Sequence, residues 1–177
     1  MTEIEIPRPQ SGDVVDLILE DHRLFEDLMR RLRDETQDRV AVRATLADVL
    51  VAHAEAEEQH VYPALVRKDA IDDEDAEHGE REHDEGHEAL LALLEVDDVS
   101  SEDFGEALEE LTTALAHHLD EEERDILNPA RTEVPDDTRA ELGRRFAGER
   151  ATQLEARCGE LDNVRRLVER ARQRAGD

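Results

Sequence analysis

The sequence is poor in several residue types, and each shortage excludes a class of protein. It has one cysteine, Cys158, no tryptophan and only 2% aromatic residues. A single cysteine excludes any disulfide within the chain. No segment carries the ~18 apolar residues that a membrane-spanning helix needs. The opening residues, MTEIEIPRPQ, lack the basic and apolar regions of a signal peptide. We therefore expect a cytoplasmic protein.

Positive charge is also scarce. The chain has 22 Lys and Arg against 49 Asp and Glu, which gives a formal net charge of -27. Nucleic acids and anionic membranes are bound through clustered basic side chains, so we expect neither as a partner. The acidic excess is typical of a surface that keeps a protein in solution.

Strong helix formers dominate what is present, and 177 residues suffice for one domain with a core. Apolar residues spaced by three and four predict four helices. Their predicted extents are from Ser11 or Asp13 to about Asp34, from Asp38 to Arg67, from an acidic turn at residues 68–80 to Glu95, and from Ser100 or Ser101 to Asn128-Pro129. Short loops between them predict an all-α, up-down-up-down antiparallel four-helix bundle.

The chain divides into three predicted parts. Residues 1–10 contain Pro7 and Pro9 and are expected to form an extended N-terminal tail. Residues 11–131 hold the bundle domain. Residues 132–177 form a C-terminal helical extension of one or two amphipathic helices, which glycines interrupt. This extension could pack on the bundle, or make a homodimer or a contact with a protein partner, and the role of Cys158 within it is open.

All four predicted helices carry histidine on the stripe where a soluble helix normally places leucine. Residues four apart lie one turn apart on one face, so both can reach the same metal centre. One buried histidine is usually a hydrogen-bonded core residue, but burying many polar groups without partners costs ~2–7 kcal/mol each. A metal centre would satisfy the whole set: His22, His53, Glu57, His83, His87, His118 and Glu122.

The donor chemistry predicts the metal. Imidazole and carboxylate without thiolate suit iron or manganese better than structural zinc. Seven ligands are too many for one ion, so we expect two ions that share the carboxylates and leave one coordination position open for a small ligand. Three further residues are candidates for supporting roles or extra ligation: His60, Tyr62 and His117.

These three candidates differ in where helical periodicity places them. His60 lies on the inward stripe, His117 is turned ~100° from it, and Tyr62 is not placed inward. A ferritin-like carboxylate site, built on Glu57-x-x-His60 and Glu80-x-x-His83, is the weaker alternative because the set is so rich in histidine.

Four stretches resemble the hemerythrin/HHE cation-binding family: DLILEDHRLFEDL, HAEAEEQHVYPAL, EHDEGHEALLALL and HHLDEEERDILNPA, which together span about Asp13 to Arg131. The resemblance implies a four-helix bundle around a non-haem, oxo- or hydroxo-bridged di-iron site, with the five histidines of the set as ligands and its two glutamates as bridges. His118-x-x-x-Glu122 is similar to the wider HHE group, whereas His83-x-x-x-His87 is similar to oxygen-carrying hemerythrins.

The resemblance also implies that the protein handles O₂, hydrogen peroxide or nitric oxide. Three roles are compatible with it: reversible binding of a small diatomic ligand, catalase-like or NO-processing turnover, and an iron- or oxygen-responsive regulatory module. A polar core that binds no metal is a further alternative. The sequence leaves open whether the protein is an enzyme.

Overall fold

The structure is a computed structural model that describes residues 4–177. Within these residues it is helical and has no strand, which confirms the all-α prediction. Its elements are α1 (Val14–Leu32), α2 (Arg39–Ala56), η1 (Glu57–Val61), α3 (Tyr62–Arg67), α4 (Asp73–Leu94), α5 (Glu102–Glu122), η2 (Glu123–Leu127), α6 (Asn128–Glu133), α7 (Asp136–Glu155) and α8 (Leu161–Gly176).

Side-chain caps set the starts of the long helices. The Asp13 carboxylate accepts a hydrogen bond from the first turn of α1, and Ser101 does so for α5. At α4, Asp72 and Asp75 form a reciprocal capping box. The predicted acidic turn at residues 68–80 was therefore wrong in its second half, because these caps begin the helix at Asp73.

Two of the long helical rods, α2–η1–α3 and α5–η2–α6, contain a π turn. In each rod a proline lies two residues after the end of the π turn. Pro63 follows η1, and Pro129 follows η2. Proline has no N–H to donate to the carbonyl oxygen of the residue four positions earlier, and its ring collides with that carbonyl group. The helix therefore widens locally. The prediction that Asn128-Pro129 ends the fourth helix was wrong, because the rod passes through this widened turn and continues to Glu133.

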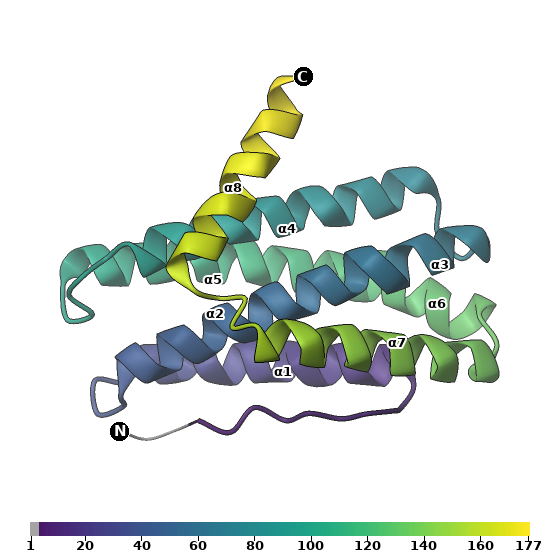
Figure 1. Ribbon diagram of the computed structural model, residues 1–177, viewed down its shortest axis with the longest axis horizontal. Helices are drawn as coiled ribbons and strands as arrows, with labels where there is room; N and C mark the ends of the chain where they lie inside the picture. The colour runs from purple at the N-terminus through teal and green to yellow at the C-terminus, as the bar shows by residue number, and fades with distance from the viewer. Residues whose placement is uncertain (1–3) are drawn as a thin grey trace.

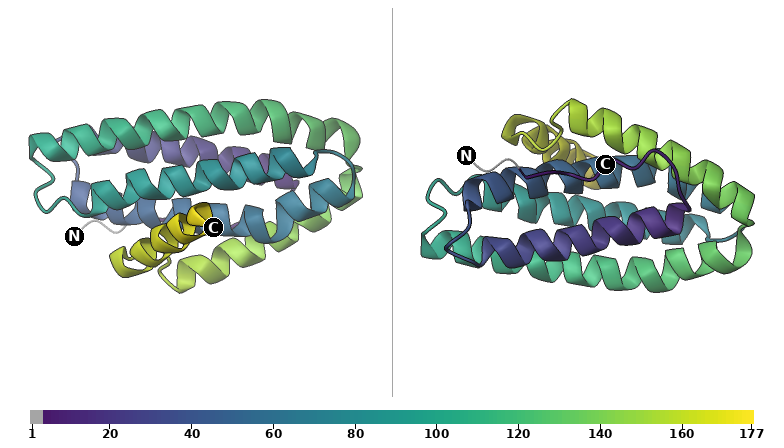
Figure 2. Two further views of the ribbon diagram at one scale, coloured as in Figure 1. Left: turned by 90° about the horizontal axis from the view of Figure 1, so that it is seen from above. Right: turned by 90° about the horizontal axis from the view of Figure 1, so that it is seen from below.

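The rods lie lengthwise beside one another, and the chain reverses direction at each connection between them (Figure 1). The most extensive contacts join α4 to α5, α2 to α7 and α1 to α2, with smaller contacts between α2 and α4 and between α1 and α5. Helix α7 lies along α1 and α2, while α8 crosses α4 (Figure 2). None of the described helices has both the length and the hydropathy that crossing a lipid bilayer requires.

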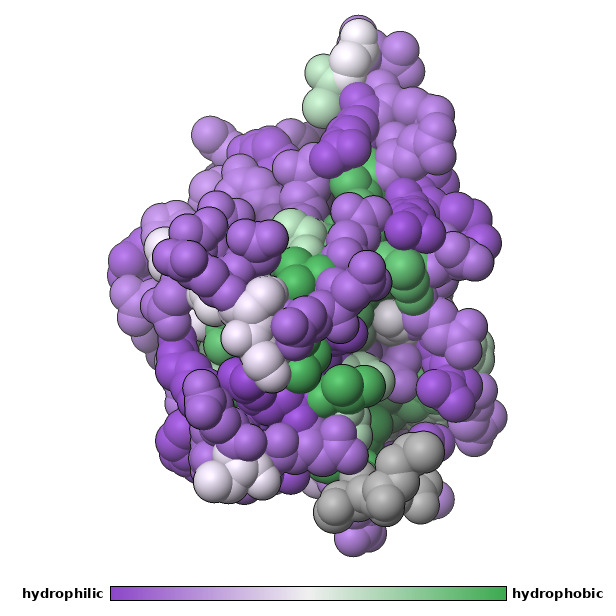
Figure 3. All heavy atoms as spheres, turned by 90° about the vertical axis from the view of Figure 1, so that its left-hand side faces the viewer, coloured by the Kyte–Doolittle hydropathy of each residue, from purple (hydrophilic) through white to green (hydrophobic). Residues whose placement is uncertain are grey.

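The apolar core is split into two clusters. The larger includes Phe25, Leu46 and Phe104, and the smaller includes Ile18 and Phe146. The end of the molecule beyond the larger cluster presents a largely hydrophilic surface with apolar side chains set back between charged ones (Figure 3). Buried histidines and glutamates lie between the two clusters, on the faces that would otherwise join them into one core.

The N-terminal tail and α7 are tied to the rods. The carbonyl oxygen of Pro7 accepts a hydrogen bond from Arg150 Nη1 at 2.7 Å. Gly143 lets α7 approach the loop before α1, because a Cβ at this position would lie 1.8 Å from the carbonyl oxygen of Gly12. Phe146 of α7 is buried in the smaller apolar cluster. The first helix of the C-terminal extension therefore belongs to the same packed body as α1 and α2.

Candidate metal centre

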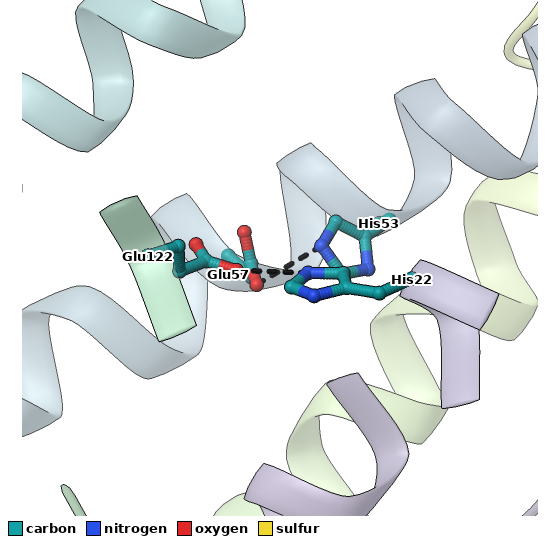
Figure 4. Close-up of side chains that lie close together, drawn as sticks. All are labelled: His22, His53, Glu57 and Glu122. Atoms are coloured by element: carbon teal, nitrogen blue, oxygen red, sulfur yellow. Dashed lines mark hydrogen bonds and ion pairs between the residues drawn. The ribbon is translucent and has the colours of Figure 1, made fainter. Parts of the chain in front are cut away.

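The first half of the buried cluster joins α1, α2 and the start of η1 to the end of α5. His22 Nε2 lies 3.0 Å from Glu122 Oε1, and His53 Nε2 lies 3.0 Å from Glu57 Oε1. The four side chains converge from three parts of the bundle: His22 from α1, Glu122 from α5, and His53 and Glu57 from the continuous helix α2–η1 (Figure 4). Each offers one ligand atom, and these atoms lie within 4.8 Å of one another, so they could hold a single metal ion.

The second half uses the other oxygens of the same two carboxylates. Glu57 Oε2 lies 3.1 Å from His83 Nε2, and Glu122 Oε2 lies 3.7 Å from His118 Nε2. These four residues form a second group of ligand atoms within 4.8 Å of one another. Each glutamate thus faces one histidine of the first half with one oxygen and one histidine of the second half with its other oxygen, an arrangement that could bridge two ions.

Each of the four histidines also contacts a second, outer carboxylate through Nδ1. The pairs are His22–Glu123 at 3.0 Å, His53–Asp21 at 3.0 Å, His83–Glu58 at 2.8 Å and His118–Glu82 at 3.3 Å. A carboxylate that accepts the Nδ1 proton fixes the imidazole ring and leaves the Nε2 lone pair available to a metal. All four rings therefore point Nε2 at the two inner glutamates.

The inner atoms are poorly satisfied by the protein alone. His53 Nε2, Glu57 Oε1 and His118 Nε2 are buried and have no hydrogen-bond partner, although the first two lie 3.0 Å apart. Buried polar atoms without partners are costly. A shared cation would satisfy these atoms together, so the donor set fits a metal.

Charge inside the cluster moves several pKa values. Burial acts to lower the pKa of His53, but Glu57 and Asp21 outweigh it and raise that pKa to about 10. Burial opposes ionisation of Glu57, yet His53 and His83 hold its pKa well below the usual range. The inner carboxylate is therefore ionised, as a metal ligand must be, and a metal at His53 would displace a proton.

Tyr62 lies at the centre of the second half. Its single hydroxyl proton can be donated to Glu122 Oε2 or, at 3.2 Å, to Glu57 Oε2, while its ring stacks on His83 with centroids 5.7 Å apart. Burial, with Glu122 and Glu57, holds the pKa of this phenol well above its usual value, so it stays protonated. The expectation that periodicity does not place Tyr62 inward was wrong, because the π turn returns residue i+5 to the face of Glu57.

The same π turn turns His60 away from the cluster. His60 is half-buried and its Nε2 faces Glu149 of α7 at 3.6 Å, so its placement on the inward stripe was wrong. His117 is exposed and lies beside Glu121. Glu80 is exposed as well, which leaves the ferritin-like alternative without its second inward pair.

His87 is buried but stands apart from both groups of ligand atoms. It lines a cavity of about 20 Å³ together with His53, His83 and His118. Burial, helped by the nearby charge of His83, lowers the pKa of His87 to about 4, so its imidazole is neutral at pH 7. A neutral imidazole beside this cavity can approach either a metal or a small ligand.

Two charged residues that sequence reasoning missed support His53. Asp21 accepts hydrogen bonds from Arg150, with Nη2 to Oδ1 at 2.7 Å and Nε to Oδ2 at 2.9 Å, and both side chains are buried. Phe146, one turn before Arg150, meets the His53 ring edge-on with centroids 5.6 Å apart. The C-terminal extension therefore supports a histidine of the cluster.

The outer carboxylates carry a sequence signal that could have revealed them. Every one is the direct neighbour of an inward residue: Asp21 of His22, Glu58 of Glu57, Glu82 of His83, and Glu123 of Glu122. Neighbouring residues on a helix are turned by ~100°, so a residue next to an inward ligand faces the adjacent helix. Each rod therefore supplies the outer carboxylate for a histidine on another rod.

The buried histidine–glutamate clusters of this helical protein are compatible with a metal site. The model of the hemerythrin HHE cation binding domain matches residues 13–130, and the chain belongs to this family. The resemblance inferred from the four stretches is confirmed. No curated protein and no solved structure matches the chain.

Proposed function

We propose that the chain is a hemerythrin-like non-haem di-iron protein that binds or processes O₂, hydrogen peroxide or nitric oxide. His22 and His53 would hold one iron, His83 and His118 the other, and Glu57 and Glu122 would bridge them within an up-down-up-down antiparallel bundle. The observation that carries the proposal is the division of each inner carboxylate between two histidine pairs. His87 is the candidate for an additional ligand on the second iron.

The surroundings of the site favour a small ligand. The cavity of about 20 Å³ is walled on its apolar side by Phe25, Leu50 and Leu115. A volume of this order holds about one water-sized molecule. When bound, iron would supply reversible electron transfer to such a ligand; manganese is the less favoured metal because the set is rich in imidazole. The apolar walls would limit the access of water.

Tyr62 favours a second candidate function, the turnover of hydrogen peroxide. Its protonated hydroxyl lies against both inner carboxylates, where it can give a proton to a reacting oxygen and recover it. A pure carrier has no evident need for such a group. A catalase-like enzyme would use it in each cycle.

Rapid mixing separates the two functions. We expect the reduced iron-loaded protein to form a stable ligand-bound spectrum with O₂ if it is a carrier, and the oxidised protein to evolve O₂ from hydrogen peroxide if it is an enzyme. In the second case Tyr62→Phe should keep its iron while peroxide turnover falls by ~10²-fold or more, the usual contribution of a proton-transfer group. An iron-loaded protein that gives neither reaction, with nitric oxide also inert, would contradict the proposal.

A further inference from the structure

A second group of histidines and glutamates lies on the surface side of the buried cluster. It takes two residues from α4 and two from α5, and we name it the outer ring: His78, Glu82, His117 and Glu121. His78 Nε2 lies 2.6 Å from Glu121 Oε2 and 3.5 Å from Glu82 Oε1. His117 Nε2 lies 3.4 Å from Glu121 Oε1 and 3.7 Å from Glu82 Oε2. Each imidazole therefore faces both carboxylates.

Glu82 distinguishes the outer ring from ordinary surface charge. Its side chain is only 7% exposed. Oε1 accepts the hydrogen bond of His118 Nδ1, but Oε2 is buried and has no hydrogen-bond partner. His117 Nε2 of the ring lies 3.7 Å from Oε2, too far for a hydrogen bond. A buried carboxylate oxygen without a partner is costly, and a cation within the ring would satisfy it.

The spacing of the ring atoms suits a small divalent cation. A tetrahedral zinc ion with bonds of ~2.0–2.1 Å separates its ligand atoms by about 3.3 Å. Three of the four nitrogen–oxygen separations in the ring, 3.4, 3.5 and 3.7 Å, are near this value, although they involve different oxygens of the two carboxylates. His78, Glu82 and Glu121 each offer one ligand atom within 4.8 Å of the others, and His117 stands beside this group. With half of its donors imidazole, the ring can bind Zn²⁺ as well as the Fe²⁺ or Mn²⁺ that imidazole–carboxylate sets favour, and Zn²⁺ serves as the probe.

His78, Glu82 and Glu121 of the outer ring line an open pocket of about 160 Å³ that also reaches Glu122 of the buried cluster, whereas His117 lies outside this lining. Carboxylates of Glu74, Asp75 and Asp125 add negative charge to its lining, and the one arginine of the lining, Arg81, lies 3.9 Å from Glu77. Arg124 is nearby, but its guanidinium is paired with Asp125 at 2.8 Å and lies farther, 3.8 Å, from Glu121. An acidic recess of this kind concentrates cations from solution.

We propose that the outer ring is a divalent-cation site, separate from the buried cluster and linked to it through Glu82. One carboxylate oxygen of Glu82 serves His118 and the other serves the outer cation. The site does not depend on which metal the buried cluster holds.

Equilibrium dialysis against Zn²⁺, with the bound metal counted by elemental analysis, tests the outer site. Wild-type protein should bind about one Zn²⁺ per chain more than the double variant His78→Ala/His117→Ala, which lacks the neutral nitrogen donors of a tetrahedral site. His60→Ala removes a histidine that lies outside both sites and should match wild type. Equal Zn²⁺ binding by wild type and the double variant would overturn the proposal.

Two further variants test whether the Zn²⁺ difference comes from the outer ring itself. In a His53→Ala background the difference of about one Zn²⁺ between the two proteins should persist, because His53 belongs to the buried cluster. If this difference disappeared, the outer histidines would act only through the buried cluster, and the proposal would be overturned. Glu121→Gln alters only a partly exposed carboxylate and should weaken binding of the outer Zn²⁺ by ~10-fold or more. An unchanged outer affinity in this variant would also count against the site.

Discussion

At the scale of single residues, the pair formed by Asp21 and Arg150 has two separable effects. Asp21→Asn should destabilise the fold by ~3–5 kcal/mol, because it leaves the buried guanidinium of Arg150 without its counter-charge. It should also weaken iron binding by ~10-fold or more, because Asp21 orients His53. Urea unfolding and competition for iron against a chelator measure the two effects.

The matched double variant Asp21→Asn/Arg150→Met separates these effects. Removing the guanidinium takes away the unpaired charge, so much of the lost stability should return. Iron affinity should stay low, because Asp21 contacts His53 directly and Arg150 does not. Recovery of both stability and affinity would show that Asp21 acts on the cluster only through folding.

Cys158 provides a test by pH. Burial and the nearby Asp48 raise the pKa of this thiol from 9.0 to about 12, and its Sγ donates a hydrogen bond to the Asp48 carbonyl oxygen. At pH 8 the folded protein should hold ~10³-fold less thiolate than the unfolded chain, so a disulfide reagent should react slowly until urea is added. Because folding raises the pKa of Cys158, the protonated thiol contributes to the free energy of unfolding. This contribution is complete below pH 9 and is lost as pH rises towards 12. Rapid reaction of the native protein at pH 8 would contradict this burial.

At the scale of elements, α3 and α4 approach each other closely at Gly79. A Cβ at this position would lie 2.9 Å from the Tyr62 ring. Gly79→Ala should therefore cost ~1–3 kcal/mol through overpacking and displace the Tyr62 hydroxyl from the inner carboxylates. Gly105→Ala is the matched control: it lies on the exposed face of α5 with open space around it, and should stabilise by up to ~1 kcal/mol. The two free energies of unfolding should change in opposite directions.

Helical periodicity predicted the rods well where the 3.6-residue period is unbroken. It placed His53 and Glu57 correctly on a buried face, since both lie before or at the start of the π turn. It failed for His60 and Tyr62, because the widened turn between Glu57 and Pro63 shifts the register by one residue. A proline six residues after an inward glutamate marks this turn, but the sequence alone does not say whether a proline ends a helix or widens it.

At the scale of the whole molecule, sequence reasoning left open whether the C-terminal extension packs on the bundle and assigned none of its residues to the site, whereas the structure packs α7 against the site. Long-range packing of this kind has no local sequence signal: Arg150 lies 129 residues from Asp21. Only the buried ion pair and the edge-on contact of Phe146 with His53 reveal the connection. Whether α8 also serves a homodimer or a regulatory partner stays a prediction.

Two truncations test the different roles of the last helices. A chain ending at Pro135 lacks both α7 and α8, so it exposes the apolar side of α1 and α2 and leaves Asp21 without Arg150. It should lose cooperative unfolding and stoichiometric iron binding. A chain ending at Glu160 lacks only α8. Burial of Val164 and Val168 of this helix each stabilises the fold by roughly 1.5–3 kcal/mol. It should keep its iron and melt at a lower temperature. Full iron binding by the shorter chain would contradict the supporting role of α7.

Iron content combined with electron paramagnetic resonance tests the di-iron proposal most directly. Protein loaded with Fe²⁺ and then oxidised should contain about two irons per chain, as expected for paired carboxylate-bridged ions in a helical bundle. Those irons should give no signal from isolated ferric ions, because Glu57 and Glu122 link them. A protein that binds only trace iron, or whose iron gives the full signal of isolated ferric ions, would contradict a bridged pair at these two carboxylates.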